Sequence, residues 1–168
     1  MPYFSVSLTK LTVMSVLTWG MYPLFWHYKN WQLVSVRTGG GRYLQPLAQT
    51  FFVFFLCYPL FKRIRRQAHE LGVRPFRALP LALAWILLSL AGNLPDWFSL
   101  LSLVSFAPLL RVQSAVNEIN AIVEPECALN SRFSVWNFLA CAVGSAALAV
   151  LLLDSFAPEL LELSDPAD

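Results

Sequence analysis

Charged residues are absent from five long stretches of this chain, and those stretches determine the predicted architecture. They are largely apolar and cover residues 11–28, 43–61, 78–95, 97–110 and 133–153. A helix needs roughly 20 apolar residues to cross the hydrocarbon core of a bilayer, with about 17 as the lower limit. Four stretches reach this limit, and the stretch before Arg111 can continue past that residue, whose long side chain can reach the interface. The pattern therefore predicts an all-α fold, a polytopic transmembrane helical bundle of about five membrane segments in a single domain of residues 1–168.

Glycine and proline residues in the first two stretches leave a second topology open. The possible break points are Gly20, Pro23, Pro46 and Pro59. If residues 4–28 and 43–61 form re-entrant or interfacial segments instead of full spans, the bundle has three spans plus these two segments. Non-helical backbone at that depth has to be buried in protein.

The composition favours a membrane environment. Hydrophobic residues make up 57% of the 168 residues and charged residues only 13%, and the mean hydropathy is +0.57. Soluble domains carry about 25% charged residues, and a soluble core of this size could not hide so much apolar surface. We therefore expect lipid to be the solvent for most of the chain.

Basic residues are concentrated in the segment 62–77, and they predict which side of the membrane it faces. Its basic residues are Lys62, Arg63, Arg65, Arg66, Arg74 and Arg77, against Glu70 alone. Because lysine and arginine accumulate in cytoplasmic loops, we expect a basic cytoplasmic loop and a cytoplasmic N-terminus. With five spans, nine of the 12 basic residues then lie inside, and the acidic tail 154–168 lies outside.

Four side chains of this segment are also candidates for contact with anionic lipid: Lys62, Arg63, Arg65 and Arg66. Each basic residue near an anionic membrane surface contributes about 1 kcal/mol of attraction. The alternative is that the charges act only as the ordinary signal for sidedness, without a bound partner. Nucleic acid is not an expected partner, because only His69 and Phe76 in this segment could stack on bases.

The connection 111–132 is predicted to be an amphipathic cytoplasmic extension of the preceding helix. Four polar residues share one helical stripe in it, at i, i+4, i+7 and i+11: Gln113, Asn117, Asn120 and Glu124. This stripe can face water, bridge to a partner helix or bind a lipid headgroup. Water is the simplest interpretation, although amides are poor choices for solubility alone.

The last stretch carries a candidate helix-packing face. Ala140 and Gly144 form a small-xxx-small pair, which lets two helices approach closely in lipid. Asn137 lies one turn inside the predicted span, where an unpaired amide is costly. We therefore expect Asn137 to form a hydrogen bond with another helix.

Catalytic and metal-binding motifs are not evident. The two histidines, His27 and His69, lie far apart and both adjoin basic residues, and the three cysteines show no CxxC spacing. The charge-free stretches contain no paired carboxylates that could act as acid and base. We therefore expect no enzymatic activity, no metal site and no cofactor.

The N-terminal stretch FSVSLTKLTVMSVLTWGMYPLFWHYKNW resembles a group of small bacterial membrane proteins of unknown function. Their approximate signature, K-x-x-V-M-S-x-x-T-x-G-x-Y-x-x-x-W-x-Y-K-N-W, matches Lys10 through Trp31, and Phe4 and Val6 extend the match toward the N-terminus. The later stretch LPDWFSLLSLVSFAPLLRVQSAVNEIN is also similar to such proteins, whereas Pro23 departs from their pattern. The resemblance implies a location in the bacterial inner membrane and implies no activity.

Two functional hypotheses follow. The first is a non-enzymatic accessory or scaffold protein of the membrane that packs against partner membrane proteins or against its own copies. The second is a small-solute or lipid transporter, or a lipid-handling protein, that acts as an oligomer. Membrane lipids are expected to be contacts in either case.

Overall fold

The computed structural model describes the backbone of residues 2–94 and 96–164 and the side chains of residues 2–94 and 98–150. The secondary structure in this part of the chain is all α-helix and 3-10 helix, without strands, as the sequence predicted. The elements in order are α1 (Leu8–Leu17), α2 (Met21–Arg37), α3 (Leu44–Phe51), α4 (Val53–Glu70), α5 (Ala78–Leu90), η1 (Ala91–Asn93), η2 (Asp96–Val104), α6 (Ala107–Val123) and α7 (Val135–Ser164).

The first charge-free stretch is not one continuous helix. α1 begins at the cap Ser7, whose hydroxyl accepts a hydrogen bond from the Lys10 amide at 3.2 Å, and it ends at Leu17. The chain then reverses at Trp19 (φ 44°) and Gly20 (φ 79°), a left-handed conformation that glycine adopts at little cost. The break lies at Gly20, one of the predicted points, and Pro23 lies within the first turn of α2, where proline is tolerated.

The second stretch is broken as well, at a position that the sequence did not indicate. α3 and α4 meet at Phe52 with a bend of 110°. Neither Pro46, which lies in the first turn of α3, nor Pro59, which lies inside α4, causes this break. Both predicted N-terminal spans are therefore pairs of shorter helices.

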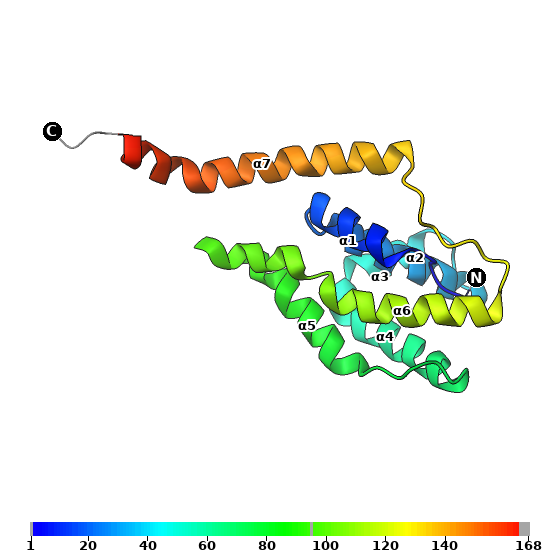
Figure 1. The fold of residues 1–168 in the computed structure, drawn as a ribbon. Coiled ribbons are helices and arrows are strands. Elements are labelled where there is room, and N and C mark those ends of the chain that lie inside the picture. Colours follow the sequence, from blue (N-terminus) through cyan, green and yellow to red (C-terminus); the bar gives the residue numbers. More distant parts are fainter. Residues whose placement is uncertain (1, 95, 165–168) are drawn as a thin grey trace.

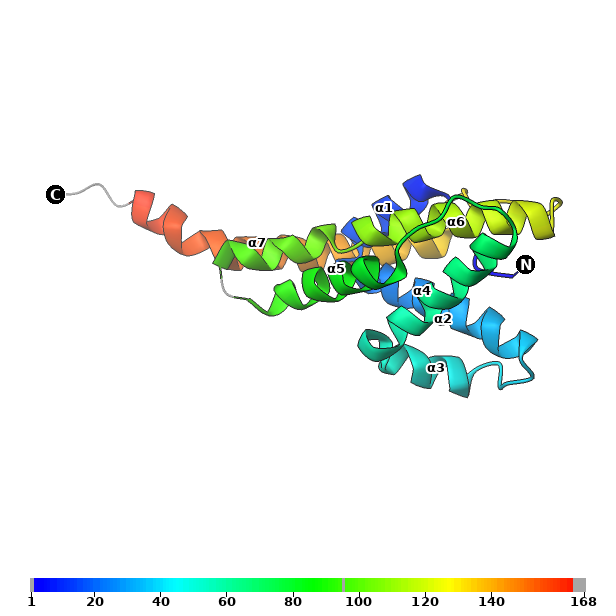
Figure 2. The same ribbon diagram turned by 90° about the horizontal axis from the view of Figure 1, so that it is seen from below.

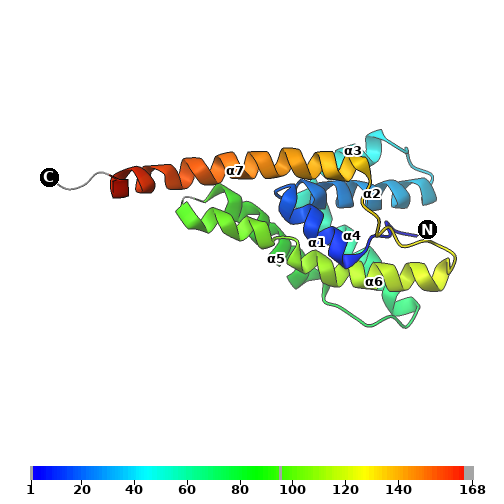
Figure 3. The same cartoon turned by 45° about the horizontal axis from the view of Figure 1, so that its top comes forward.

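α6 packs against α1, α4 and α5 (Figure 1). Its buried apolar residues meet those of α4 in the main core, and the two sets are Leu109, Val112, Ala115, Val116 and Ile119 from α6 and Cys57, Leu60, Phe61, Ile64 and Ala68 from α4. α7 packs on α1, on the far side from α4. Figures 2 and 3 show that α7 and the α5–η2 hairpin extend in the same direction, away from the end of the molecule that holds the N-terminus.

The structure supports a membrane location only in part. Among the described residues, one helix, Phe98–Val123, is long and apolar enough to cross a bilayer, and the bent α3–α4 pair adds a second if it counts as one span. The other apolar helices are shorter: Leu8–Leu17, Ala78–Asn93 and Val135–Val150. The prediction of five full spans is therefore not confirmed, whereas the prediction of a helical bundle is.

Two predicted segments differ from the observed structure, and a third agrees with it. The basic segment 62–77 is not a loop throughout, because α4 continues to Glu70 and only residues 71–77 connect it to α5. α7 extends beyond the predicted last span to Ser164, so much of the predicted tail 154–168 has helical backbone, while residues 165–168 lie outside the described residues. The amphipathic helix predicted within 111–132 is present and ends at Val123.

Arg111 lies near the connection 71–77 and holds it in place. Its guanidinium donates hydrogen bonds to the carbonyl oxygens of Arg74 (2.9 Å) and Pro75 (3.2 Å). The charged end of this side chain therefore contacts polar backbone just before the start of α5, whereas its predicted position at a membrane interface stays a prediction.

Candidate anion-binding pocket

The basic residues of α4 lie on its exposed face because the opposite face is committed to the core. Buried apolar residues recur along α4 with helical spacing, at Leu60, Phe61, Ile64 and Ala68. This stripe turns the basic residues between them toward solvent. Lys62, Arg63, Arg65, Arg66 and His69 are all exposed.

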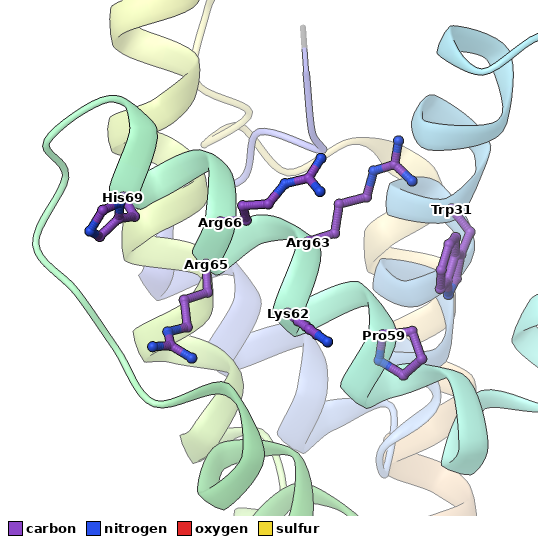
Figure 4. Close-up of a pocket in the computed structure, with 7 residues that line it drawn as sticks. All are labelled: Trp31, Pro59, Lys62, Arg63, Arg65, Arg66 and His69. Carbon is purple, nitrogen blue, oxygen red and sulfur yellow. The ribbon is translucent and has the colours of Figure 1, made fainter.

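A cavity of about 610 Å³ lies beside this face, between α4 and α2. It is lined by Trp31 of α2 and by Pro59, Lys62, Arg63, Arg65, Arg66 and His69 of α4. Figure 4 shows Lys62, Arg63 and Arg66 directed toward the side of α4 that faces Trp31, whereas Arg65 and His69 point to the opposite side of the helix. All four predicted lipid-contact residues therefore line one pocket, with three of them directed to the same side.

The positive charge of this pocket is poorly compensated. No acidic residue is among the described residues that line it. Arg66 forms an ion pair with Glu70 at 3.5 Å, but the two side chains are 78% and 60% exposed, and such exposed pairs contribute little. An anion would therefore meet several cations that lack strong internal partners.

Another guanidinium extends the positive region toward the N-terminal segment. The Arg37 guanidinium lies over the ring of Tyr3, 5.0 Å from its centroid. Burial raises the pKa of the Tyr3 phenol, and the nearby charges of Arg37, Arg63 and Arg66 act in the opposite direction. These three arginines therefore act on the same buried phenol from two helices, which places their charges in one region.

Trp31 also lines this pocket, and sequence reasoning did not assign it to the site. Its side chain is 7% exposed, and its indole nitrogen Nε1 is buried without a hydrogen-bond partner in the described residues. In the sequence, Trp31 belongs to the stretch that resembles other membrane proteins. No spacing rule connects it to Lys62, because the contact between α2 and α4 is tertiary.

The predicted polar stripe of α6 does not face water. Gln113 is fully buried, Asn120 is 2% exposed and Asn117 is half-buried. These amides, together with Asn30 of α2, bind the extended backbone of residues 2–7. We call this set of four amides the amide clasp. Glu124, the fourth residue of the predicted stripe, is exposed at the end of α6 and is not part of it.

The amide clasp replaces the hydrogen bonds that secondary structure would give to residues 2–7. Asn120 accepts from the Tyr3 amide at 3.2 Å and donates to the Tyr3 carbonyl at 3.0 Å, as a neighbouring strand would. Asn30 accepts from the Phe4 amide at 3.1 Å. Gln113 donates to the carbonyls of Phe4 and Val6. Because buried backbone groups need partners, the stripe has an internal structural role that accounts for its amides.

The predicted helix-packing residues also have partners inside the chain. Gly144 lies directly against the backbone of α1, and a Cβ added there would clash with the Leu17 carbonyl and lie 2.7 Å from the Cα of Thr18. Ala140 is exposed. The expected bond from Asn137 to another helix is replaced by a local pair. The side-chain oxygen Oδ1 of Asn137 accepts from the backbone amide of Ser134 at 3.0 Å, and the Ser134 hydroxyl accepts from the backbone amide of Asn137 at 3.3 Å. This reciprocal pair is a capping box at the start of α7.

No known protein family, no curated protein and no solved structure matches this chain.

Proposed function

We propose that this chain is a non-enzymatic membrane protein whose basic pocket binds the phosphate headgroup of an anionic lipid. This is the lipid-handling hypothesis of the sequence, with a defined site. The accessory or scaffold hypothesis loses two of its supports, because Gly144 and the amides of α6 already have partners within the chain.

The observation that carries the proposal is the change along α4 from an exposed apolar residue near its start to exposed basic residues further on. Phe55, near its start, is 80% exposed, which suits contact with lipid, and Lys62 follows seven residues later. At 1.5 Å of rise per residue, these positions are about 10 Å apart along the helix. The headgroup region on each side of a bilayer is about 5–7 Å thick. A helix that has Phe55 in the hydrocarbon therefore carries its basic pocket at or just beyond the headgroups.

Other exposed apolar residues support this placement. On α3, Leu44 and Phe51 are 82% and 83% exposed. On α5, the residues Leu79, Leu83, Leu87 and Leu90 form an exposed ridge at helical spacing. Water would not stabilise surfaces of this kind. The positive-inside rule and the resemblance to small bacterial membrane proteins support a cytoplasmic side for the pocket and an inner-membrane location.

The test is lipid retention by protein reconstituted in nanodiscs of neutral phosphatidylcholine. Native mass spectrometry counts the bound dioctanoyl phosphatidic acid in a titration. We expect the double variant Arg63→Gln with Arg66→Gln to weaken binding at least tenfold, because it removes two cations directed into the pocket. The matched control is Arg74→Gln with Arg77→Gln, which removes the same charge from exposed side chains that do not line the pocket. An equal loss in both variants would show diffuse attraction and would overturn the proposal.

The exposed face of α7 favours the accessory or scaffold hypothesis as a second candidate. Trp136, Leu139 and Val143 share one side of the helix and are 79%, 52% and 72% exposed. Either lipid or a partner helix can cover such a face. Native mass spectra of protein gently extracted from its own membrane separate the two. A stoichiometric protein partner would favour the second candidate, whereas a carried phospholipid without protein would favour the first.

A further inference from the structure

The indole N–H of Trp31 has no acceptor in the described residues, although it is buried. Native folds leave few buried donors without a partner, so each one requires an explanation. Trp31 belongs to the wall of the basic pocket. Figure 4 shows that Lys62 and Arg63, both exposed, extend toward the helix that carries it. Because these side chains are long and flexible, they can move to let a ligand reach the indole.

We infer that the Trp31 indole donates a hydrogen bond to a phosphate oxygen of the ligand, which makes the pocket selective for phosphate over carboxylate. The inference rests on the proposed function and names the chemistry of the same site. A phosphate offers oxygens in a tetrahedral arrangement, so guanidinium groups can take two of them while another meets a neutral donor. A carboxylate has two oxygens in one plane, and one arginine can occupy both.

The wall of the pocket also indicates a ligand with an apolar part. Trp31 and Pro59 contribute apolar surface to the pocket beside the cations. A free phosphate ion would leave this surface in water, whereas the glycerol and the first methylene groups of a phospholipid would cover it. The arrangement therefore favours a lipid phosphate over a soluble phosphate ester, and both share the same contact with Trp31.

Trp85 provides a matched control within the same chain. Its indole N–H is also buried without a partner in the described residues. The pocket that it lines, between the α1–α2 break and the α5–η2 hairpin, has no charged residue among its described lining. The substitutions Trp31→Phe and Trp85→Phe each remove one such N–H and keep an aromatic ring.

The experiment measures the affinity of reconstituted protein for dioctanoyl phosphatidic acid, decanoate and glycerol phosphate. We expect Trp31→Phe to weaken binding of phosphatidic acid about tenfold, the effect of one hydrogen bond to a charged group. Decanoate binding should not change, and Trp85→Phe should stay within about twofold of the unmodified protein for every ligand. Glycerol phosphate should bind more weakly than the lipid and lose affinity with Trp31→Phe in the same way.

The outcomes separate this inference from the proposed function. If Trp31→Phe binds phosphatidic acid normally while the Arg63 and Arg66 double variant does not, the inference is wrong and the proposed function stands. If glycerol phosphate binds as tightly as the lipid and depends on Trp31, the phosphate contact stands and the lipid assignment fails. If no ligand binds, both fail.

A second measurement avoids any folding defect in the variants. In unmodified protein labelled with ¹⁵N at its indoles, the Trp31 N–H signal should shift downfield on addition of phosphatidic acid, while the Trp85 signal stays in place. A Trp31 signal that does not move at saturating lipid would overturn the inference.

Discussion

Replacement of Asn120 by alanine should release the N-terminal segment from the protein. Asn120 is 2% exposed and supplies both hydrogen bonds of the Tyr3 backbone, to the amide and to the carbonyl. The Asn120→Ala substitution leaves two buried polar groups without partners. Each such group costs about 1–3 kcal/mol, so the penalty is about 2–6 kcal/mol. The segment can avoid this penalty only by leaving its site and exposing Tyr3 to water.

Asn117 is the matched control, because its loss is partly compensated. It donates one hydrogen bond to the Val6 carbonyl at 2.9 Å, and the same carbonyl also accepts from Gln113 at 3.3 Å. The Asn117 side-chain oxygen also accepts from Gln113 Nε2 at 2.7 Å, but Gln113 keeps its bonds to the Phe4 and Val6 carbonyls when Asn117 is lost. The Asn117→Ala substitution therefore leaves no backbone group of the segment wholly unpaired. Its cost should be close to that of one ordinary hydrogen bond, about 0.5–1.5 kcal/mol.

Hydrogen exchange of the backbone amides measures the difference. With Asn120→Ala, the amides of Tyr3 and Phe4 should exchange at least thirtyfold faster than in unmodified protein, because 2 kcal/mol corresponds to about this factor. With Asn117→Ala, the acceleration should stay near tenfold or less. Exchange that is equally fast in both variants, or unchanged with Asn120→Ala, would refute the role given to the amide clasp.

The remaining predictions concern α7. The Gly144→Leu substitution should destabilise the fold by about 1–3 kcal/mol through overpacking against Leu17, and should lower the thermal midpoint without changing the oligomer size. The control Ala142→Val, at an exposed position of α7, should leave the midpoint nearly unchanged. A smaller oligomer with an unchanged midpoint would restore the intermolecular role instead. The Ser134→Ala substitution should cost about 1 kcal/mol as the loss of a helix cap and increase hydrogen exchange in the first turn of α7. Equal exchange in Ser134→Ala and in the control Ser131→Ala would count against the capping box.

Periodicity in the sequence identified which residues share a face, but it did not identify what that face contacts. Gln113, Asn117 and Asn120 do lie together on α6, as their spacing predicted. Their partner is an extended segment more than 100 residues away in sequence, and nothing in that segment marks it as buried. The preference for amides over charged residues was the available signal, because an amide both donates and accepts.

The number of spans could not be predicted for a different reason. Hydropathy counts apolar residues and does not detect a bend between two apolar helices. Gly20 marked the first break, because a left-handed turn favours glycine. The second break, at Phe52, has no such signal in the sequence, because its backbone dihedrals (φ −91°, ψ 31°) do not require glycine. Similarly, the small residues of α7 predicted a close helix contact, but the sequence could not say that the contact is with α1 of the same chain.

The amide clasp and the basic pocket share one helix, and this links the fold to the proposed site. Asn30 binds the N-terminal segment and also donates to the Trp26 carbonyl within α2, while the Trp26 indole donates to Gln113 of α6. These bonds fix the rotation of α2 about its axis. Trp31 directly follows Asn30, so the same rotation brings its side chain against α4. A polar network buried in the core thus sets the position of the donor that we assign to the ligand, and a buried network of this kind holds a single arrangement better than apolar packing alone.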